Sequence, residues 1–353
     1  MGIELYRFEM SAPDDVRSLK RALHESAAHD ASRLAIVAKT EGTATINDFG
    51  RSLAMRAMRD SLAEAKVRTE ALIIISMGSE GVITPGGYLF VQKANGSSRL
   101  PGLALGMARS PAMAPADLMN DRHIIVAQQT VTRAINDAGI EHKDVALVLA
   151  KTPLLTREMA IDLPAPQKEM ANSSSAARAA AALGIGVAMG EIKPADAASE
   201  SIGRRHDLHA CRAMIFSGTE TDRIEIIVLG NRPGSAPAIR SGLIADLIDI
   251  EGLAHIATGV KEGAIEHALK LAASGRIAAA FLKVGVSPDG RLRGNRTTVF
   301  SSDLDPDKHM RAAASGVLGA LLGDTRFFVS GGAEHQAPPG GGVFAIILNS
   351  EAE

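Results

Sequence analysis

The sequence predicts an α/β fold of three similar domains around a pseudo-threefold axis, with a central β-core and the helices outside. The prediction depends on one pattern that occurs three times. In each copy an apolar strand ends in a lysine, a helix carries an arginine, and a second apolar strand runs into a small-residue loop that closes with a glutamate. Internal repeats of this kind define the architecture. The predicted domains cover residues 1–105, 106–235 and 236–353.

The first strand of each copy is a short apolar run that delivers a lysine at its end. An expected strand over residues 3–8 and a helix over 13–26 come before the first copy, and a helix over 124–138 comes before the second. The three runs and their lysines are 34–38 with Lys39, 145–150 with Lys151, and 278–282 with Lys283.

Each lysine is followed by an expected helix that carries an arginine: Arg51, Arg178 or Arg311. The first helix is expected to begin near Asn47 and Asp48, because Asx residues are natural N-caps. The other two helices are rich in Ala and Gly and stop at a glycine, which predicts close packing on a sheet. In every copy the arginine lies 13 residues before an acidic residue: Glu64, Glu191 or Asp324.

The second strand of each copy ends in a serine: Ser76, Ser217 or Ser330. The loops that follow are rich in small residues and end in Glu80, Glu220 and Glu334. Two stretches rich in Gly, Pro and small residues, 98–119 and 231–242, are interpreted as linkers between the copies.

The composition excludes several classes of protein. The chain has 353 residues, 46% of them hydrophobic, and a net charge of -2, which indicates a globular protein without the basic surface that nucleic acid or an anionic membrane requires. Aromatic residues make up 3%, with no Trp, so base-stacking platforms are not expected. The single cysteine, Cys211, fits a reducing compartment, and the N-terminal residues lack a signal-peptide pattern, so a cytoplasmic location is expected. The longest uncharged apolar stretch, 179–190, is too short to span a bilayer.

Lysine, arginine and serine in triplicate indicate a particular chemistry. A lysine at the end of a buried strand loses solvation, which lowers its pKa and allows its neutral amine to activate a serine. Arginine offers a planar set of donors for carbonyl or enolate oxygens, and backbone N–H groups after the serines, as at Gly218 and Gly331, can hold an oxyanion. A single strand-terminal lysine is usually a surface residue, but matching positions in three copies favour a site. The implied substrate is a small flat ring bearing several carbonyls.

Four segments, 38–51, 147–156, 225–231 and 329–342, resemble the cyanuric acid hydrolase/barbiturase family of ring-opening amidohydrolases. The resemblance spans essentially the whole chain. It implies the family's three-domain fold, homotetramers, and hydrolytic opening of a cyclic imide or amide by one Ser-Lys pair at the centre of three pseudo-equivalent sites. No cofactor is required for that chemistry.

The resemblance also implies roles for individual residues. The family's second-repeat pair is thought to carry out the reaction, which assigns the base to Lys151. The other two lysine–serine pairs and the three arginines would position the ring: Lys39 with Ser76, Lys283 with Ser330, and Arg51, Arg178 and Arg311.

The second copy departs from the family pattern. Counting back four residues from the loop glutamate gives Ser76 and Ser330 in two copies but Phe216 in the second, with Ser217 one step later. A one-residue step turns a strand side chain to the opposite face unless a bulge restores it, so the identity of the nucleophile stays open. Met77 stands where the family usually has a small residue after the first-copy serine, and it is expected to narrow or reshape the cavity. The change from Ser to Phe argues for a substrate ring with an apolar edge.

A second departure concerns a structural cation. The resemblance implies a cation near the third-copy loop, held by a glutamate two residues after the third lysine together with loop oxygens. That position is Gly285 here, while the loop persists. Weak or absent binding of a divalent or monovalent cation is expected. The remaining ligand positions are Ala333, Gln336, Ala337, Pro338 and Gly341.

Other signals are weaker. Residues 184–190 approximate a dinucleotide fingerprint but have one residue too many and lie late in a helix. His206 and His209 lack a third ligand nearby. Two hypotheses therefore remain: an enzyme that opens a cyanurate-, barbiturate- or related ring, and a catalytically altered homologue that binds a ring without hydrolysing it, for which Phe216 and Gly285 are the motive.

Overall fold

The computed structural model describes residues 2–94, 98 and 100–350. Met1 and residues 351–353, at the ends of the first and third predicted domains, and Arg99, in the first predicted linker, lie outside the described residues.

The chain forms three four-stranded sheets, one in each of three segments that we name repeats A, B and C. Repeat A comprises residues 2–93, repeat B residues 103–231, and repeat C residues 239–348. The strands of repeat A are β1 (Gly2–Glu9), β2 (Arg33–Thr40), β3 (Ala71–Met77) and β4 (Gly86–Lys93). Those of repeat B are β5 (Leu103–Arg109), β6 (Val145–Pro153), β7 (Ala213–Gly218) and β8 (Glu225–Asn231). Those of repeat C are β9 (Ile239–Ile244), β10 (Ile277–Val284), β13 (Phe328–Gly331) and β14 (Gly342–Leu348).

The three sheets share one topology. Their strand orders are β1-β4-β2-β3, β5-β8-β6-β7 and, read from its other edge, β9-β14-β10-β13. In each repeat the strand that ends in lysine pairs in parallel with the edge strand that follows the helix, and antiparallel with the strand after that. The expected threefold repetition of an α/β unit is therefore confirmed at the level of strand connections.

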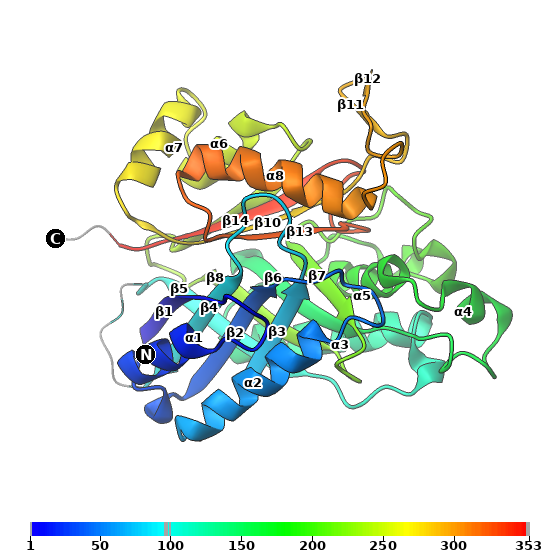
Figure 1. The fold of residues 1–353 in the computed structure, drawn as a ribbon, viewed down its shortest axis with the longest axis horizontal. Coiled ribbons are helices and arrows are strands. Elements are labelled where there is room, and N and C mark those ends of the chain that lie inside the picture. Colours follow the sequence, from blue (N-terminus) through cyan, green and yellow to red (C-terminus); the bar gives the residue numbers. More distant parts are fainter. Residues whose placement is uncertain (1, 95–97, 99, 351–353) are drawn as a thin grey trace.

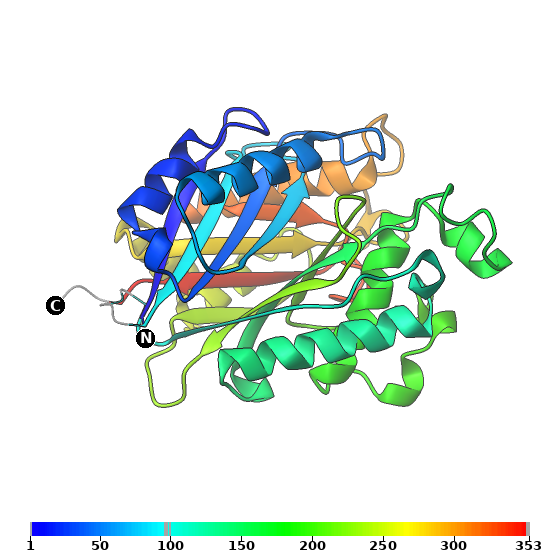
Figure 2. The same ribbon diagram turned by 90° about the horizontal axis from the view of Figure 1, so that it is seen from below.

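The helices cover the outer faces of the sheets, which meet at the centre (Figure 1; Figure 2). Repeat A carries α1 (Arg17–Glu25) and α2 (Gly50–Glu64), and repeat B carries α3 (Asp121–Ala138), α4 (Ala165–Met170) and α5 (Ser174–Ala188). Repeat C carries α6 (Ile250–Thr258), α7 (Ala264–Ala273), α8 (Pro306–Leu322) and a hairpin of β11 (Arg291–Leu292) and β12 (Asn295–Arg296). Short 3-10 turns occupy Ala28–Asp30, Pro115–Asp117, His142–Asp144, Pro194–Asp196 and Ser199–Ser201.

Strand alternation divides the apolar residues into one central core and three outer cores. Successive side chains of a strand point to opposite faces. In β2, Ala35 and Val37 enter the central core, whereas Leu34 and Ile36 pack outward against α1 and α2. The inner faces of all three sheets contribute to the central core in this way. The lysine near the end of each lysine-bearing strand (β2, β6 and β10) continues the inward series, which directs its side chain toward the common centre.

Two expected linkers prove wrong in part. Residues 98–119 contain β5, and residues 231–242 contain the start of β9. The small residues in β5 serve packing: a Cβ on Gly106 would lie 2.0 Å from the carbonyl oxygen of Ala134 in α3. The glycine lets the helix approach the sheet closely, so this composition does not mark a loop.

The helix starts and the glycine-rich stretch differ from simple sequence patterns. Helix α2 begins at Gly50 after Phe49, and the Asp48 carboxylate accepts a hydrogen bond from the Gly50 N–H without being the N-cap. Gly184 lies inside α5, where a Cβ would meet the Ile124 carbonyl of α3 at 2.0 Å. Gly184 thus allows α3 and α5 to pack closely. Among the described residues, no helix is long and apolar enough to cross a membrane.

Candidate active site

Parallel strand register brings each inward lysine beside one residue of the next strand. Lys39 pairs with Ser76, Lys283 with Ser330, and Lys151 with Phe216. The equivalence of Phe216 with the two serines, predicted from the loop glutamates, is therefore confirmed.

Repeats A and C each hold a buried lysine–serine pair. The Nζ atom of Lys39 lies 3.2 Å from the Ser76 Oγ and 3.2 Å from the Met77 carbonyl oxygen. The Nζ atom of Lys283 lies 3.4 Å from the Ser330 Oγ and 2.8 Å from the Gly331 carbonyl oxygen. Both lysines are 1% exposed, so their amines have little water to replace these partners.

Repeat B is built differently. Lys151 donates to the carbonyl oxygens of Ile75 at 3.1 Å and Ser217 at 3.3 Å, and it forms a very short ion pair with the Glu220 carboxylate. The hydroxyl of Ser217 donates instead to the Ser174 carbonyl oxygen at 3.2 Å. The residue before Ser217 keeps the inward position, as expected without a bulge, so this structure forms no contact between Lys151 and the Ser217 hydroxyl.

Three arginines link the repeats in a closed ring, each meeting the loop glutamate of the next repeat. Arg311 of repeat C holds Glu80 of repeat A in two hydrogen bonds of 2.7 and 2.9 Å. Arg178 of repeat B holds Glu334 of repeat C in the same way, at 2.8 and 2.7 Å. Arg51 of repeat A is held less firmly: its Nε lies 3.1 Å from Glu220 without hydrogen-bond geometry.

A cavity of about 320 Å³ lies where these groups converge. Ser76, Ser330, Phe216 and Met77 line it, as Met77 was expected to do. Lys39 and Lys151 do not line the cavity, because both are buried behind the lining residues. Gly218 does not line it either. The remaining lining residues are Thr43, Ala44, Thr45, Arg51, Ser174, Arg178, Ser217, Lys283, Asp305, Asp307, Lys308, Arg311 and Gly331.

The electrostatics separate the three lysines. Burial lowers the pKa of Lys39 well below its ordinary value, and the nearby cations Arg311 and Lys283 lower it further. Burial also lowers the pKa of Lys283, with Arg178 acting in the same direction. The pKa of Lys151 falls to about 8 through burial, while the Glu220 carboxylate opposes the change. A buried amine among cations is favoured in its neutral form.

Aromatic side chains pack beneath the cavity. The rings of Phe216 and Phe328 meet edge to face with centroids 5.3 Å apart. The Nζ atom of Lys283 lies 4.8 Å from the Phe216 centroid, and that of Lys39 lies 5.5 Å from the Phe328 centroid. The centre of the molecule thus combines an aromatic cluster with the hydroxyl and charged groups that line the cavity.

The loop expected to hold a cation offers few free ligands. Gly285 lies beside this loop, since an added Cβ would contact Ala333 at 3.4 Å, but a glycine supplies no carboxylate there. The Gln336 side-chain oxygen already accepts a hydrogen bond from the Ile215 N–H at 2.7 Å, and its amide nitrogen donates to the Gly332 and Glu334 carbonyls. Within the described part of the chain, no three His, Cys, Asp or Glu side chains form a metal cluster. This donor set does not fit a divalent cation, and weak or absent cation binding stays a prediction.

The carbonyl oxygens of three of the other expected ligand positions accept backbone hydrogen bonds. The Ala333 carbonyl accepts from the Gln336 and Ala337 N–H groups, the Pro338 carbonyl from the Gly341 N–H, and the Gly341 carbonyl from the Gly285 N–H.

His206 and His209 lie together in a turn, where the His209 ring contacts the His206 carbonyl at 2.7 Å.

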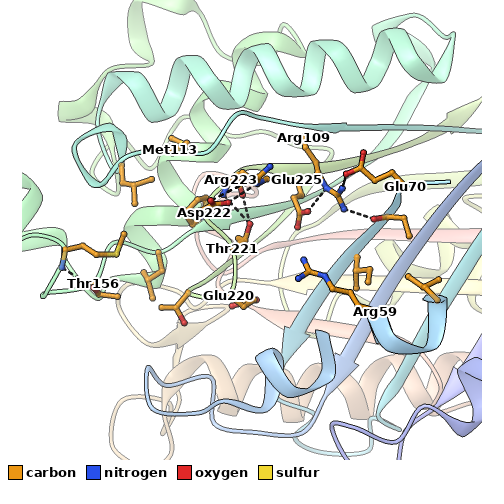
Figure 3. A pocket seen from close by; sticks show the side chains of 18 of the residues that line it. Arg59, Glu70, Arg109, Met113, Thr156, Glu220, Thr221, Asp222, Arg223 and Glu225 are labelled. Carbon is orange, nitrogen blue, oxygen red and sulfur yellow. Dashed lines mark hydrogen bonds and ion pairs between the residues drawn. The ribbon is translucent and has the colours of Figure 1, made fainter. Parts of the chain in front are cut away.

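A larger cavity of about 1000 Å³ lies between repeats A and B (Figure 3). Its charged side chains largely neutralise one another. Arg109 contacts Glu225 at 2.7 Å and also Glu70, and Arg223 contacts Asp222 at 2.8 Å. The lysine–serine pairs are absent from its lining residues, so the smaller central cavity is the better candidate for chemistry.

Sequence reasoning assigned no role to two groups that the structure brings into the site. The loop glutamates were noted as the ends of the loops, yet their pairing with the arginines depends on contacts between repeats. Asp307 lines the cavity 3.5 Å from Arg178, and burial raises its pKa despite that arginine. Its place four residues before Arg311, on the same helix face, is a signal that could have found it.

Comparisons with known proteins identify the family. The family model described as amidohydrolase ring-opening protein matches residues 4–349. Cyanuric acid amidohydrolases of Ectopseudomonas oleovorans and Rhizobium leguminosarum are 34% and 35% identical, over 99% and 98% of this chain and 100% and 98% of their own. The crystal structure of the cyanuric acid hydrolase from A. caulinodans superposes with a TM-score of 0.85 at 32% identity, covering 99% of both chains. A second solved cyanuric acid hydrolase gives a TM-score of 0.86 at 29% identity, again over 99% of both chains.

The repeated fold and the site define an enzyme that hydrolyses cyclic amides. The family resemblance of the four segments is confirmed. The chain belongs to the family of ring-opening amidohydrolases. The alternative of a homologue that binds a ring without hydrolysing it receives no support from these comparisons.

Proposed function

We propose that the protein opens a cyclic imide of the cyanurate or barbiturate type by a serine–lysine mechanism in the central cavity. The observation that carries the proposal is the presence of two buried lysine–serine pairs, Lys39 with Ser76 and Lys283 with Ser330, on one cavity flanked by three arginines. Lysine-activated serine is suited to attack on an amide carbonyl. Homotetramer formation, a cytoplasmic location and barbiturase activity stay predictions.

Within this proposal Ser76 is the nucleophile and Lys39 its base. The Nζ–Oγ distance is shorter in repeat A, and the Ser330 hydroxyl also lies 3.4 Å from the Gly331 carbonyl oxygen. Lys39 faces mainly cations, whereas Lys283 has the carboxylates of Glu334 and Asp307 nearby, which favour its protonated form. This departs from the role that the resemblance assigned to Lys151, because Lys151 is paired with Glu220 and not with a hydroxyl.

The proposed reaction has two stages. Lys39 accepts the Ser76 proton as Oγ bonds to a ring carbonyl carbon, and the C–N bond breaks as the lysine returns the proton to the departing nitrogen. Water then gives a proton to Lys39 and attacks the resulting ester, and the C–O bond to Ser76 breaks as Oγ takes that proton back. The product is an open chain with a new carboxylate. Donors from the arginines would hold the ring carbonyls.

The test is turnover of a panel of cyclic imides, including cyanuric and barbituric acids, followed by loss of ultraviolet absorbance. Ser76→Ala should lower kcat by at least about 10³-fold, since it removes the nucleophile. Ser330→Ala should cost about 10- to 100-fold through poorer positioning. Ser217→Ala removes a cavity hydroxyl that donates to the Ser174 carbonyl and makes no contact with Lys151, so the rate should stay within about threefold.

Two outcomes would count against the proposal. If Ser330→Ala lost the larger activity, the nucleophile would lie in repeat C. If all three variants kept the full rate on a ring that the wild type opens, serine catalysis would be excluded.

A further inference from the structure

We propose that Phe216 and Met77 select a cyclic imide with one hydrocarbon edge: a ring in which two carbonyls flank a nitrogen on one side and a carbon carrying an alkyl group lies on the other. This inference rests on the proposed ring opening and specifies the substrate class of the same cavity.

The first step of the argument is the position of Phe216. It occupies the place in repeat B that Ser76 and Ser330 occupy in the other repeats, opposite the inward lysine. All three side chains line the central cavity. A site with threefold symmetry would offer three hydroxyls, whereas this cavity offers two hydroxyls and an aromatic ring.

The second step is that the Phe216 ring is fixed. Phe328 packs against it edge to face at 5.3 Å, and the amine of Lys283 lies 4.8 Å from its centroid. The residue is 4% exposed. Contacts of this kind stabilise one ring position, so the remaining surface of Phe216 is a permanent apolar part of the wall.

The third step is a second apolar lining residue at a matching position. Met77 follows the serine of repeat A, and the equivalent residues of repeats B and C are Ser217 and Gly331. Its sulfur accepts a hydrogen bond from the Ala44 N–H at 3.2 Å, which holds the side chain over the loop beside the cavity. Repeats A and B therefore each replace a small or polar residue with a large apolar one.

The chemistry of the ligand follows from this asymmetry. Cyanurate carries carbonyl or N–H groups on all its edges, so one of them would face Phe216 without a hydrogen-bond partner. Burying an unpaired polar group is unfavourable, whereas burying an alkyl group there is favourable. A ring with a hydrocarbon edge can keep its imide carbonyls on the serine and arginine walls.

The experiment compares cyanurate with a barbiturate that carries an ethyl group on its ring carbon. For each compound, kcat/KM and the Kd from calorimetry are measured with wild type, Phe216→Ser and Phe216→Leu. The wild type should favour the ethyl-substituted ring, and Phe216→Ser should lower that preference by about 10- to 100-fold. Phe216→Leu, which keeps an apolar side chain, should preserve it. If Phe216→Ser does not fold in a thermal melt, Phe216→Thr takes its place, since Thr suits a strand and also supplies a hydroxyl.

The outcomes separate this inference from the proposed reaction. A wild-type preference for cyanurate, or an unchanged preference in the hydroxyl variant, would overturn the inference even if ring opening occurs. Binding preferences as expected without turnover of either ring would support the inference and contradict the proposed reaction. If neither compound binds or reacts, both are wrong.

Discussion

The buried lysine of repeat B has different partners from the buried lysines of repeats A and C. All three bury a lysine at the end of a strand in identical register. Repeats A and C give the amine a serine hydroxyl and a carbonyl, and repeat B gives it a carboxylate and two carbonyls. A buried amine beside a hydroxyl can exchange a proton with it, whereas an amine beside a carboxylate is stabilised in its charged form.

The difference extends to the loop glutamates. The Glu220 side chain is 3% exposed, while those of Glu80 and Glu334 are 23% and 28% exposed. Burial alone would raise the pKa of Glu220, but Lys151 and Arg51 lower it below its ordinary value. In repeat B, where Phe216 takes the place of the serine, Glu220 is more deeply buried and compensates the charge of Lys151. The same strand register thus places the lysine beside a hydroxyl in repeats A and C and beside a carboxylate in repeat B.

The largest expected effect tests the structural role of repeat B. Glu220→Gln removes the carboxylate that pairs with Lys151 and leaves the buried amine without this ion pair, which should lower the free energy of unfolding by about 3 kcal/mol. Glu80→Gln and Glu334→Gln, at the equivalent and more exposed positions, are the matched controls and should cost about 1 kcal/mol each. Urea denaturation measures all three. Equal losses would mean that repeat B is not distinct.

An effect of intermediate size concerns pH. If Lys39 is the base, kcat/KM should fall tenfold per pH unit only below the lowered pKa of Lys39, because the amine must be neutral. The profile should show no limb near pH 8, where Lys151 titrates. Lys151→Met should leave the shape of the profile unchanged. A limb near pH 8 that disappears in this variant would return the base to repeat B.

The smallest expected effect tests the arginine ring. Gly332 has φ +76°, and a Cβ there would lie 2.2 Å from the Arg178 guanidinium. Gly332→Ala should therefore cost about 2 kcal/mol, from backbone strain and from displacement of the Arg178–Glu334 pair. Gly323→Ala is the control: φ is +61° and nothing lies within 4 Å of the added atom, so only about 1 kcal/mol is expected. Thermal unfolding measures the loss of stability in both variants. Equal losses would mean that contact with Arg178 does not add to the effect of backbone strain.

Much of the fold could be predicted from the sequence because its pattern is local and repeated. Alternating apolar residues before Lys39, Lys151 and Lys283 define the inward face of each strand, and the end of the series places the lysines at the centre. Counting back four residues from the loop glutamates identified Phe216 as the equivalent of the serines, which the strand register confirms. Edge strand β5 was missed because its Gly and small residues serve close packing with α3, which a single sequence does not distinguish from a loop.

The site was harder to predict where it depends on contacts between repeats. The arginines and glutamates that pair lie far apart in sequence and belong to different repeats, so no local spacing links Arg311 to Glu80. The partner of Lys151 was unpredictable for the same reason: whether a strand-terminal lysine meets a hydroxyl or a carboxylate depends on how deeply a neighbouring loop enters the core.

The cyclic order of the arginine–glutamate contacts has a consequence for the order of the segments along the polypeptide. Arg311 of repeat C binds Glu80 of repeat A although the two repeats are not consecutive in the chain. Consecutive repeats are linked by contacts of the same kind. Repeats A and C are thus joined without a direct covalent connection, through their arginine–glutamate ion pair, the Arg7–Asp324 pair and the backbone hydrogen bond from the Thr84 N–H to the Thr325 carbonyl. A circular permutant that starts at repeat C and joins the original ends should therefore form the same three arginine–glutamate contacts. The order of the repeats along the chain can then change while the central cavity stays the same.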